Sequence, residues 1–354
     1  MILAYLFDRF PSTTETFLAR EVVALQKLGF QIEVYALEAG EATRRMETPP
    51  AALKLGGKAR FWRTTGEKLV PELQRHGITH IHATWANHIA DIAMAAAQKS
   101  GLSWSFSAHA RDLWVEGGDL KAKLAAAKFG AVCTREGETE LLKHGENVLY
   151  APHGLPLAEF PFKEWEKEPT TRVLGVGRLV EKKGWMDMVA AAGLCAQLHP
   201  SAQFDFQIIG EGPLRGWLEK QIAALRLDNF KLRGALSPAE VVAAMQEANC
   251  FVLPSRRAAD GDRDGLPNVL LEAAALGLPI ITSDNEGARE LVDEETARIF
   301  PACDAAALAR ALGSVRSLPG STKERCLAAR ARVERDFDVE KNVKKLAEAF
   351  GAVI

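Results

Sequence analysis

The residues best suited to chemistry lie between Asp260 and Pro279, where an irregular turn leads into a short apolar helix. Asp264 stands in the turn, and Glu272 follows eight residues later, inside the run from Val269 to Leu276. A carboxylate inside an apolar helix costs free energy unless something binds it. The start of the helix presents free amide groups and partial positive charge, which suit an anion such as phosphate. Together these features predict a ligand that carries both phosphate and hydroxyl groups.

The turn itself has recognisable chemistry. Gly265 and Pro267 shape it, Asn268 is expected to cap the helix, and Gly277 is expected to end the helix in a left-handed conformation. A simpler interpretation of Glu272 remains open, in which the side chain rotates to reach solvent.

A second stretch, Val173 to Trp185, places positive charge next to a glycine turn. An apolar strand runs into Gly175-Val176-Gly177, and Arg178 and Lys183 follow five residues apart. The third glycine of a dinucleotide fingerprint is absent, so no nicotinamide site is predicted. An Arg and a Lys on either side of such a turn can converge on one anion. The alternative for Lys182 and Lys183 is a solvated pair of charges.

These motifs occur in a characteristic order and spacing, with Gly-Glu-Gly-Pro between them at 210–213. The chain therefore resembles glycosyltransferase family 4, over most of its length and most specifically in its second half. The resemblance implies an α/β protein of the GT-B type, with two Rossmann-like, doubly wound domains facing across a cleft. It also implies a retaining enzyme that takes a hexose from a nucleotide sugar and needs no cofactor and no metal.

The resemblance assigns roles to individual residues. Arg178 and Lys183 would hold the donor diphosphate, Asp264 the donor sugar and Glu272 the ribose. Asp264 stands where the family more often has Glu. The other matching donor-site positions are Gly177, Gly234, Gly265, Leu266, Pro267 and Asn268. The base would lie against backbone near 233–236, so uridine and guanosine donors are not distinguished.

His109 follows a strand expected over 103–108, at the carboxyl edge of the sheet, where ligands of open α/β sheets bind. Its position matches a family histidine that faces the donor sugar, so it is predicted to be catalytic. Metal sites are not predicted. His80, His82 and His88 have no accompanying acid ligands, and Asp260-Gly261-Asp262 resembles the metal motif of a different glycosyltransferase fold.

The segment FPSTTETF near the N-terminus replaces the glycine-rich loop of many family members. It resembles the subset similar to the colanic-acid and exopolysaccharide transferases. The resemblance implies that Thr14 and Glu15 lie on the acceptor side, with Glu15 and its neighbouring amides facing the acceptor or the donor phosphate. The alternative is that Ser12 and Glu15 merely form a capping box at a helix start.

Strands and helices alternate along the chain, which predicts a mostly parallel sheet in each of two domains. We expect an N-terminal acceptor-side domain at 1–162, a donor domain at 163–335 and a final helix at 336–354 that crosses back to the first domain. The charged segment 160–170 is the expected linker.

Composition limits the partners and the compartment. The 354 residues include 44 basic and 46 acidic side chains, a balance that argues against nucleic-acid binding. Five scattered cysteines without metal-ligand spacing indicate reduced core residues in a cytoplasmic protein. A signal peptide and membrane-spanning helix are not expected. The basic segment 43–68 has two interpretations, a peripheral contact with the inner membrane or a solvated loop.

The sequence thus predicts a hexosyltransferase that uses a UDP or GDP sugar and a growing glycan or glycolipid acceptor, in exopolysaccharide or lipopolysaccharide biosynthesis. Two alternatives stay open. One is a sugar-nucleotide epimerase of the same architecture, and the other is a scaffold that binds nucleotide without catalysis.

Overall fold

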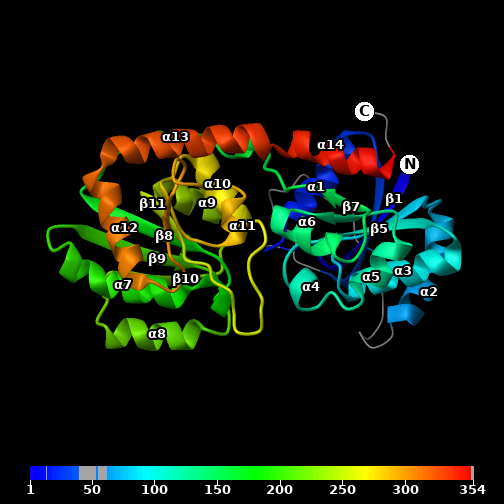
Figure 1. Ribbon diagram of the computed structural model, residues 1–354, viewed down its shortest axis with the longest axis horizontal. Coiled ribbons are helices and arrows are strands. Elements are labelled where there is room, and N and C mark those ends of the chain that lie inside the picture. The colour runs from blue at the N-terminus through cyan, green and yellow to red at the C-terminus, as the bar shows by residue number, and fades with distance from the viewer. Residues whose placement is uncertain (13, 40–52, 55–61, 352–354) are drawn as a thin grey trace. The chain divides into compact units, whose positions relative to one another are not determined.

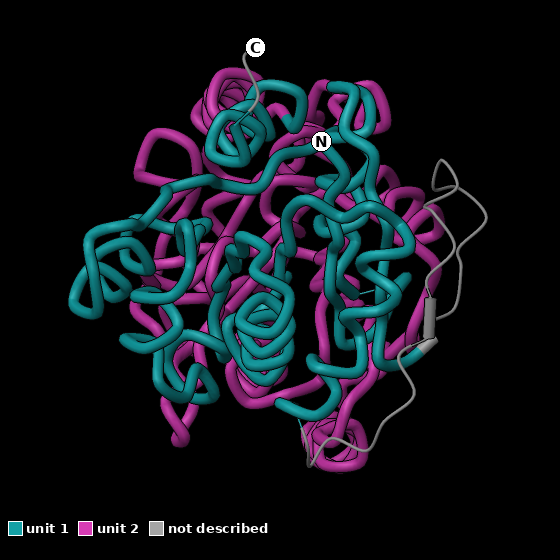
Figure 2. The backbone as a smooth tube through the Cα atoms, turned by 90° about the vertical axis from the view of Figure 1, so that its right-hand side faces the viewer, with its two compact units in different colours: residues 1–155, 339–354 teal, residues 156–338 magenta. Residues whose placement is uncertain are grey.

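The computed structural model describes residues 1–12, 14–39, 53–54 and 62–351. Its contacts group the chain into two compact units (Figure 2). Unit 1 comprises Met1–Leu155 and Val339–Ile354, and unit 2 comprises Pro156–Asp338. Most of the basic segment 43–68 lies outside the described residues.

The boundary between unit 1 and unit 2, after Leu155, lies before the expected linker at 160–170 because that linker packs on unit 2. Phe160 is buried, and its carbonyl accepts a hydrogen bond of 2.8 Å from the guanidinium of Arg330. The amide of Lys163 donates to the carbonyl of Leu276. The segment therefore behaves as part of the second unit and not as a free connection.

Unit 1 is built on a parallel sheet of seven strands in the order β3-β2-β1-β4-β5-β6-β7 (Figure 1). The strands are β1 (Ile2–Phe10), β2 (Gln31–Ala39), β3 (Leu53–Lys54), β4 (His80–Ala83), β5 (Ser103–Ala108), β6 (Gly130–Val132) and β7 (Val148–Tyr150). The helices are α1 (Thr16–Lys27), α2 (Trp62–Arg75), α3 (His88–Ser100), α4 (Arg111–Trp114), α5 (Leu120–Ala126), α6 (Arg135–Leu142) and α14 (Val339–Phe350).

Side chains of β1 alternate between two cores, one on each face of this sheet, because successive residues of a strand point to opposite faces. Leu3, Tyr5 and Phe7 pack with helices α1 and α14. Ala4 and Leu6 pack with α2 and α3 in the other core. The last helix of the chain thus completes the core of unit 1.

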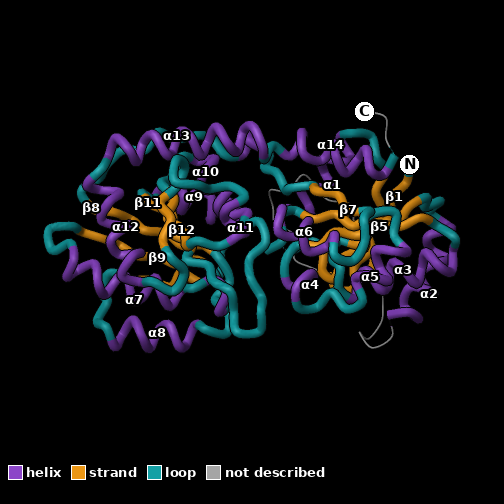
Figure 3. Tube along the Cα trace, in the orientation of Figure 1, coloured by secondary structure: helices purple, strands orange, loops and turns teal. Residues whose placement is uncertain are grey.

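Unit 2 repeats the plan with six parallel strands in the order β10-β9-β8-β11-β12-β13 (Figure 3). The strands are β8 (Thr170–Val176), β9 (Gln203–Ile209), β10 (Phe230–Gly234), β11 (Cys250–Leu253), β12 (Ile280–Ser283) and β13 (Arg298–Phe300). The helices are α7 (Trp185–Leu198), α8 (Arg215–Ala224), α9 (Pro238–Glu247), α10 (Asn268–Leu276), α11 (Glu286–Arg289), α12 (Ala305–Ser317) and α13 (Pro319–Asp336), with short 3-10 turns η1 (Leu157–Glu159) and η2 (Glu181–Lys183).

Helices cover both faces of the second sheet (Figure 1). Helices α7, α8 and α12 pack together, and α9, α10 and α13 form the opposite layer. The central strands β11 and β12 are buried throughout, as expected of a parallel sheet covered on both faces. Helix α9 begins at a capping box formed by Ser237 and Glu240.

Each sheet has a point where the strand order reverses, between β1 and β4 in unit 1 and between β8 and β11 in unit 2. Loops leave neighbouring strands in opposite directions there, and ligands of doubly wound folds bind outside the carboxyl ends of these strands. The fold is the predicted doubly wound α/β class. Short edge strands β3 and β13 were not predicted.

Two further observations concern the cysteines and the helix lengths. Of the five cysteines, Cys303 is exposed and not in a core, whereas Cys133, Cys195, Cys250 and Cys326 are buried thiols as predicted. Within the described residues, no helix has the length and apolar character needed to cross a bilayer.

Candidate functional site

The acid and the lysine predicted to serve the donor meet directly in unit 2. Lys183, at the end of turn η2 beyond strand β8, donates from Nζ to Oδ2 of Asp264 over 2.8 Å. Ser255, just beyond strand β11, donates its hydroxyl to the same oxygen over 2.6 Å. These residues follow the two strands that flank the reversal point, so the sheet topology itself brings them together.

In the Lys183–Asp264 pair, the charge of each residue favours the ionised form of the other. Burial by itself raises the pKa of Asp264, but the neighbouring charges of Lys183 and Lys182 outweigh it and lower the pKa below its usual value. Burial lowers the pKa of Lys183, opposed by the charge of Asp264. Arg178 also lowers the pKa of Lys183 through its charge, which indicates that both cations act on one region of the site.

Lys182 is not a solvated charge, and this interpretation of the lysine pair was wrong. Its side chain is 7% exposed, and Nζ lies 3.0 Å from Oδ1 of Asp262. It also donates to the carbonyl of Arg263 over 3.1 Å. Asp262, which resembled a metal ligand in the sequence, is thus held by a cation, and the described residues contain no cluster of acids, histidines and cysteines suited to a metal.

Two glycines allow backbone segments of the site to touch. A Cβ on Gly184 would stand 1.8 Å from the carbonyl oxygen of Pro254, and the residue has a φ of +65°. A Cβ on Gly287 would stand 2.1 Å from the carbonyl oxygen of Gly265. The first contact seats the lysine turn against the loop after β11, and the second seats the start of α11 against the Asp264 turn.

Helix α10 begins one residue earlier than expected. Pro267 is the N-cap and Asn268 is the first helical residue, so the predicted capping role of Asn268 was wrong. Gly277 ends the helix in the left-handed region with a φ of +84°, as predicted. Glu272 is 7% exposed within this apolar helix, so the interpretation in which it rotates into solvent was also wrong.

The remaining predicted donor positions lie at the same carboxyl edge. Gly177 and Arg178 follow β8 directly, and Arg178 is exposed. The amide of Gly210 donates to the carbonyl of Gly234 over 2.9 Å, which joins the ends of β9 and β10. Leu266 is buried in the turn that leads to α10.

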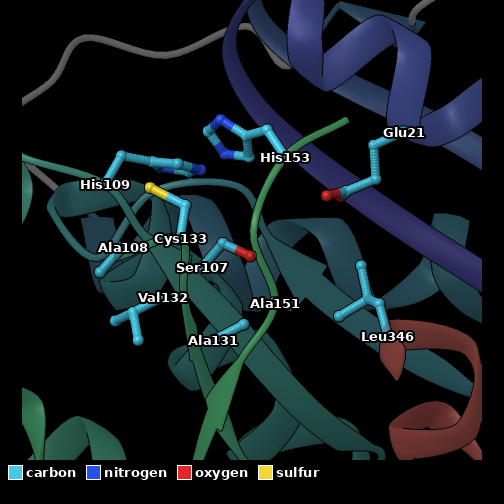
Figure 4. A pocket seen from close by; sticks show the side chains of 10 residues that line it. All are labelled: Glu21, Ser107, Ala108, His109, Ala131, Val132, Cys133, Ala151, His153 and Leu346. Carbon is cyan, nitrogen blue, oxygen red and sulfur yellow. The ribbon is translucent and has the colours of Figure 1, made fainter. Parts of the chain in front are cut away.

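A separate polar pocket lies in unit 1 around His109 (Figure 4). Its volume is about 10 Å³, close to the roughly 10–15 Å³ that one water needs. Figure 4 shows the rings of His109 and His153 together on one side and the Glu21 carboxylate and Ser107 hydroxyl facing the space. His109 is buried, and its Nδ1 atom has no hydrogen-bond partner among the described residues.

His109 is neutral at physiological pH because burial lowers its pKa to about 3. The ring packs against Phe17 and Trp85 at centroid distances of 5.1 and 4.6 Å. Its backbone is held by Asp112, whose carboxylate accepts from the amides of His109 and Ala110, each over 3.0 Å. His109 can therefore exchange hydrogen bonds with a ligand but is a poor source of protons.

Sequence reasoning missed Glu21, Asp112 and Ser255. Burial raises the pKa of Glu21 to about 7, and Tyr5 donates its hydroxyl to this carboxylate over 3.2 Å. An acid within the apolar face of a helix was the available signal, the same signal that identified Glu272. Ser255 had no local signal, since its partner lies nine residues further along the chain.

The segment around Thr14 and Glu15, predicted to lie on the acceptor side, has a different local geometry from the expected capping box. Helix α1 begins at Thr16 with Glu15 as its N-cap, so the capping box between Ser12 and Glu15 was wrong. Ser12 and Thr14 instead lie within hydrogen-bond distance of each other, at 3.2 Å. Thr14 is exposed.

Comparison with known proteins agrees with the fold. Residues 158–332 match the family described as glycosyl transferases group 1. The amylovoran biosynthesis glycosyltransferase AmsK of Erwinia amylovora is 37% identical over 179 residues, which cover 50% of this chain and 44% of that protein. The putative colanic acid biosynthesis glycosyltransferase WcaL of Escherichia coli is 25% identical over 100% of both chains.

Solved structures share the whole fold. HepE of Anabaena in complex with UDP superposes with a TM-score of 0.80 at 15% identity, covering 100% of both chains. Sucrose-phosphate synthase of Thermosynechococcus elongatus superposes with a TM-score of 0.78 at 20% identity, covering 99% of this chain and 98% of that one.

The fold and the matching domain define a glycosyltransferase of the GT-B class. Within this class, the predicted resemblance to family 4 and its colanic-acid and exopolysaccharide transferases is confirmed.

Proposed function

We propose that the protein is a retaining hexosyltransferase that takes its sugar from a UDP or GDP donor and extends a lipid-linked exopolysaccharide or lipopolysaccharide. The observation that carries this proposal is the buried Lys183–Asp264 pair at the strand-order reversal of unit 2. It sets a cation for diphosphate beside a carboxylate for hydroxyl groups, the two chemistries that a nucleotide sugar combines.

Charge builds on the leaving diphosphate as its bond to the sugar breaks, and positioned donors that strengthen with this charge lower the barrier. Arg178 can bind phosphate in a bidentate manner, and Lys183 supplies a point charge. The amides at the start of α10 add partial positive charge. No dedicated nucleophile is needed if the acceptor attacks from the face that the diphosphate leaves and gives its proton to that phosphate.

The carboxylates would hold the neutral parts of the donor. Oδ2 of Asp264 is already bonded to Lys183 and Ser255, whereas Oδ1 lies 3.8 Å from Lys182, beyond hydrogen-bond distance. We therefore assign Oδ1 to a sugar hydroxyl. Glu272 would accept from the ribose hydroxyls. His109 would exchange hydrogen bonds with the sugar, while Thr14 and Glu15 would serve the acceptor.

The named relatives support this assignment of donor and acceptor. HepE structures hold UDP and UDP-glucose, which favours a nucleotide sugar. AmsK and WcaL are named for amylovoran and colanic acid biosynthesis, which favours an exopolysaccharide acceptor.

Calorimetric titration with UDP, GDP, ADP and NAD tests the donor site. We expect one nucleoside diphosphate to bind and the Arg178→Ala variant to lose this binding. Arg172→Ala is the matched control, because Arg172 lies on β8, the strand that leads to Arg178, but bonds to Glu168 and to the carbonyl of Glu247. Equal affinity in all three proteins, or no binding to any diphosphate, would refute the donor site.

Product analysis then separates transfer from other outcomes. A transferase moves the sugar to an acceptor, whereas an epimerase changes the sugar in the absence of any acceptor, and a scaffold does neither. We expect anomeric configuration to be retained and EDTA to leave the rate unchanged, because Arg178 and Lys183 are proposed to meet the diphosphate charge. Sedimentation with anionic vesicles tests whether segment 43–68 supports peripheral membrane contact.

A further inference from the structure

Adjacent lysines of turn η2 each meet a different acid of the loop that follows β11. Lys182 bonds to Asp262 over 3.0 Å, and Lys183 bonds to Asp264 over 2.8 Å. All four side chains are buried or nearly so, with exposed fractions from 7 to 13%. The two cations and two anions cancel, which allows them to share a space from which water is largely excluded.

The loop from 254 to 267 contains no helix or strand, so its shape depends on individual contacts. Many of them go to turn η2. The amide of Arg256 donates to the carbonyl of Lys182 over 2.8 Å, and the amide of Ala259 donates to the Glu181 carboxylate over 3.3 Å. The ammonium of Lys182 adds bonds to Asp262 and to the carbonyl of Arg263. Lys182 thus holds Asp262 and Arg263, the two residues that precede Asp264.

Lys182 lies close enough to both Asp262 and Asp264 that a change in Asp262 would alter which acid it binds. Nζ of Lys182 already lies 3.8 Å from Oδ1 of Asp264. If Asp262 lost its charge, the nearest anion for this buried ammonium would be Asp264. The carboxylate would then be drawn toward Lys182 and away from the position in which Lys183 and Ser255 hold it.

We propose that Lys182 and Asp262 are positioning residues for the transfer reaction, a role that rests on the proposed function. Asp262 neutralises Lys182 and so keeps it from capturing Asp264, while Lys182 fixes the loop that carries Asp264. The pair touches neither reacting group itself and acts through Asp264.

A double-mutant cycle tests this role against a merely structural one. Asp262→Asn keeps the size of the side chain and leaves Lys182 without its anion, so we expect kcat to fall at least tenfold. Affinity for the nucleoside diphosphate should change less than threefold, because Arg178 and Lys183 remain. In the double variant, Lys182→Met removes the cation that captures Asp264, so we expect kcat to recover at least fivefold over Asp262→Asn. Two losses that merely weaken the fold would accumulate instead.

The rate is measured as release of UDP from UDP-glucose or of GDP from GDP-mannose. Lys182→Arg should retain most of the activity, since Arg keeps the charge. Arg316→Met is the matched control. This cation bonds to the carbonyl of Pro169 and the hydroxyl of Thr171 at the amino end of β8, the opposite edge of the sheet. We expect its kcat to stay within twofold of the wild type.

Trypsin supplies a readout that needs no substrate, because Arg256, Arg257 and Arg263 lie in the loop. Cleavage there should accelerate in Asp262→Asn and remain fast in the double variant, because Lys182→Met also removes the bond to the Arg263 carbonyl. Failure of the wild type to bind any nucleoside diphosphate would refute the proposed function. Binding by the wild type, together with additive losses of kcat or unchanged cleavage of the loop, would overturn the positioning role.

Discussion

The ammonium of Lys183 lies 2.8 Å from a carboxylate oxygen of Asp264, although 81 residues separate the two in the chain. The cation assigned to diphosphate and the acid assigned to the sugar are therefore one buried ion pair. Each sets the charge and position of the other, so neither can be changed without affecting both halves of the donor site.

This pairing predicts a large effect of Asp264→Asn. Lys183 would keep its burial and lose its neutralising partner, and the sugar would lose a charged acceptor. We expect kcat/KM to fall about 100-fold, equivalent to about 2.7 kcal/mol of transition-state stabilisation. Steady-state kinetics with the identified donor measures it, and a fall of less than threefold would contradict the assignment.

Glu272 carries a separate prediction because it lies on α10 and is buried in an apolar helix. Glu272→Gln preserves the shape and removes the charge. Hydrogen bonds to a charged group contribute about 1.5–3 kcal/mol, so we expect the affinity for the nucleoside diphosphate to fall at least tenfold. Calorimetry measures this change, and circular dichroism shows whether the fold is kept. Unchanged affinity would show that Glu272 does not hold the ribose.

Gly287 is predicted to be intolerant of any side chain. The Cβ of Gly287→Ala would stand 2.1 Å from the Gly265 carbonyl oxygen and 2.6 Å from that of Asp264. We expect a loss of about 1–3 kcal/mol in the free energy of unfolding. Transfer should also fall about tenfold, because a contact with the Asp264 turn must shift.

Gly216→Ala is the matched control for this substitution. Gly216 lies in helix α8, and a Cβ there would have no neighbour within 4 Å. Alanine is the better helix former, so we expect a gain of about 0.5–1 kcal/mol and normal activity. Chemical unfolding of both variants measures the contrast, and equal stabilities would contradict the predicted contact.

Three buried imidazoles predict an acid-sensitive unit 1. Burial lowers the pKa of His80 to about 4 and of His109 to about 3, and holds that of His82 well below its usual value. In the unfolded chain they titrate near 6.5, so below that pH the unfolded state binds protons that the folded state does not. The free energy of unfolding is therefore greatest above pH ~6.5. It decreases as the pH is lowered below that value, by up to about 1.4 kcal/mol per pH unit for each imidazole.

His109→Asn removes one of these three groups. We expect the free energy of unfolding to decrease less than in the wild type between about pH 7 and pH 5. The difference in slope should reach up to about 1.4 kcal/mol per pH unit, the contribution of one imidazole. Urea unfolding across this range measures the slope. Identical slopes would show that His109 takes up a proton in the folded protein.

Much of the fold and part of the site were decided by local patterns in the sequence. The bounds of β5 agree with the prediction, because an apolar run is a property of neighbouring residues. Arg178, Lys183, Asp264 and Glu272 were found in the same way, since each stands out within its own short motif.

Only the tertiary structure decided which charges are buried and what they bind. Lys182 and Lys183 are adjacent and chemically identical in the sequence, yet one holds Asp262 and the other Asp264, each across about 80 residues. Ser255 completes the pair without any local signal. These contacts exist because parallel strands β8 and β11 end side by side at the reversal of the strand order, and the meeting of two distant loops is a property of the folded sheet.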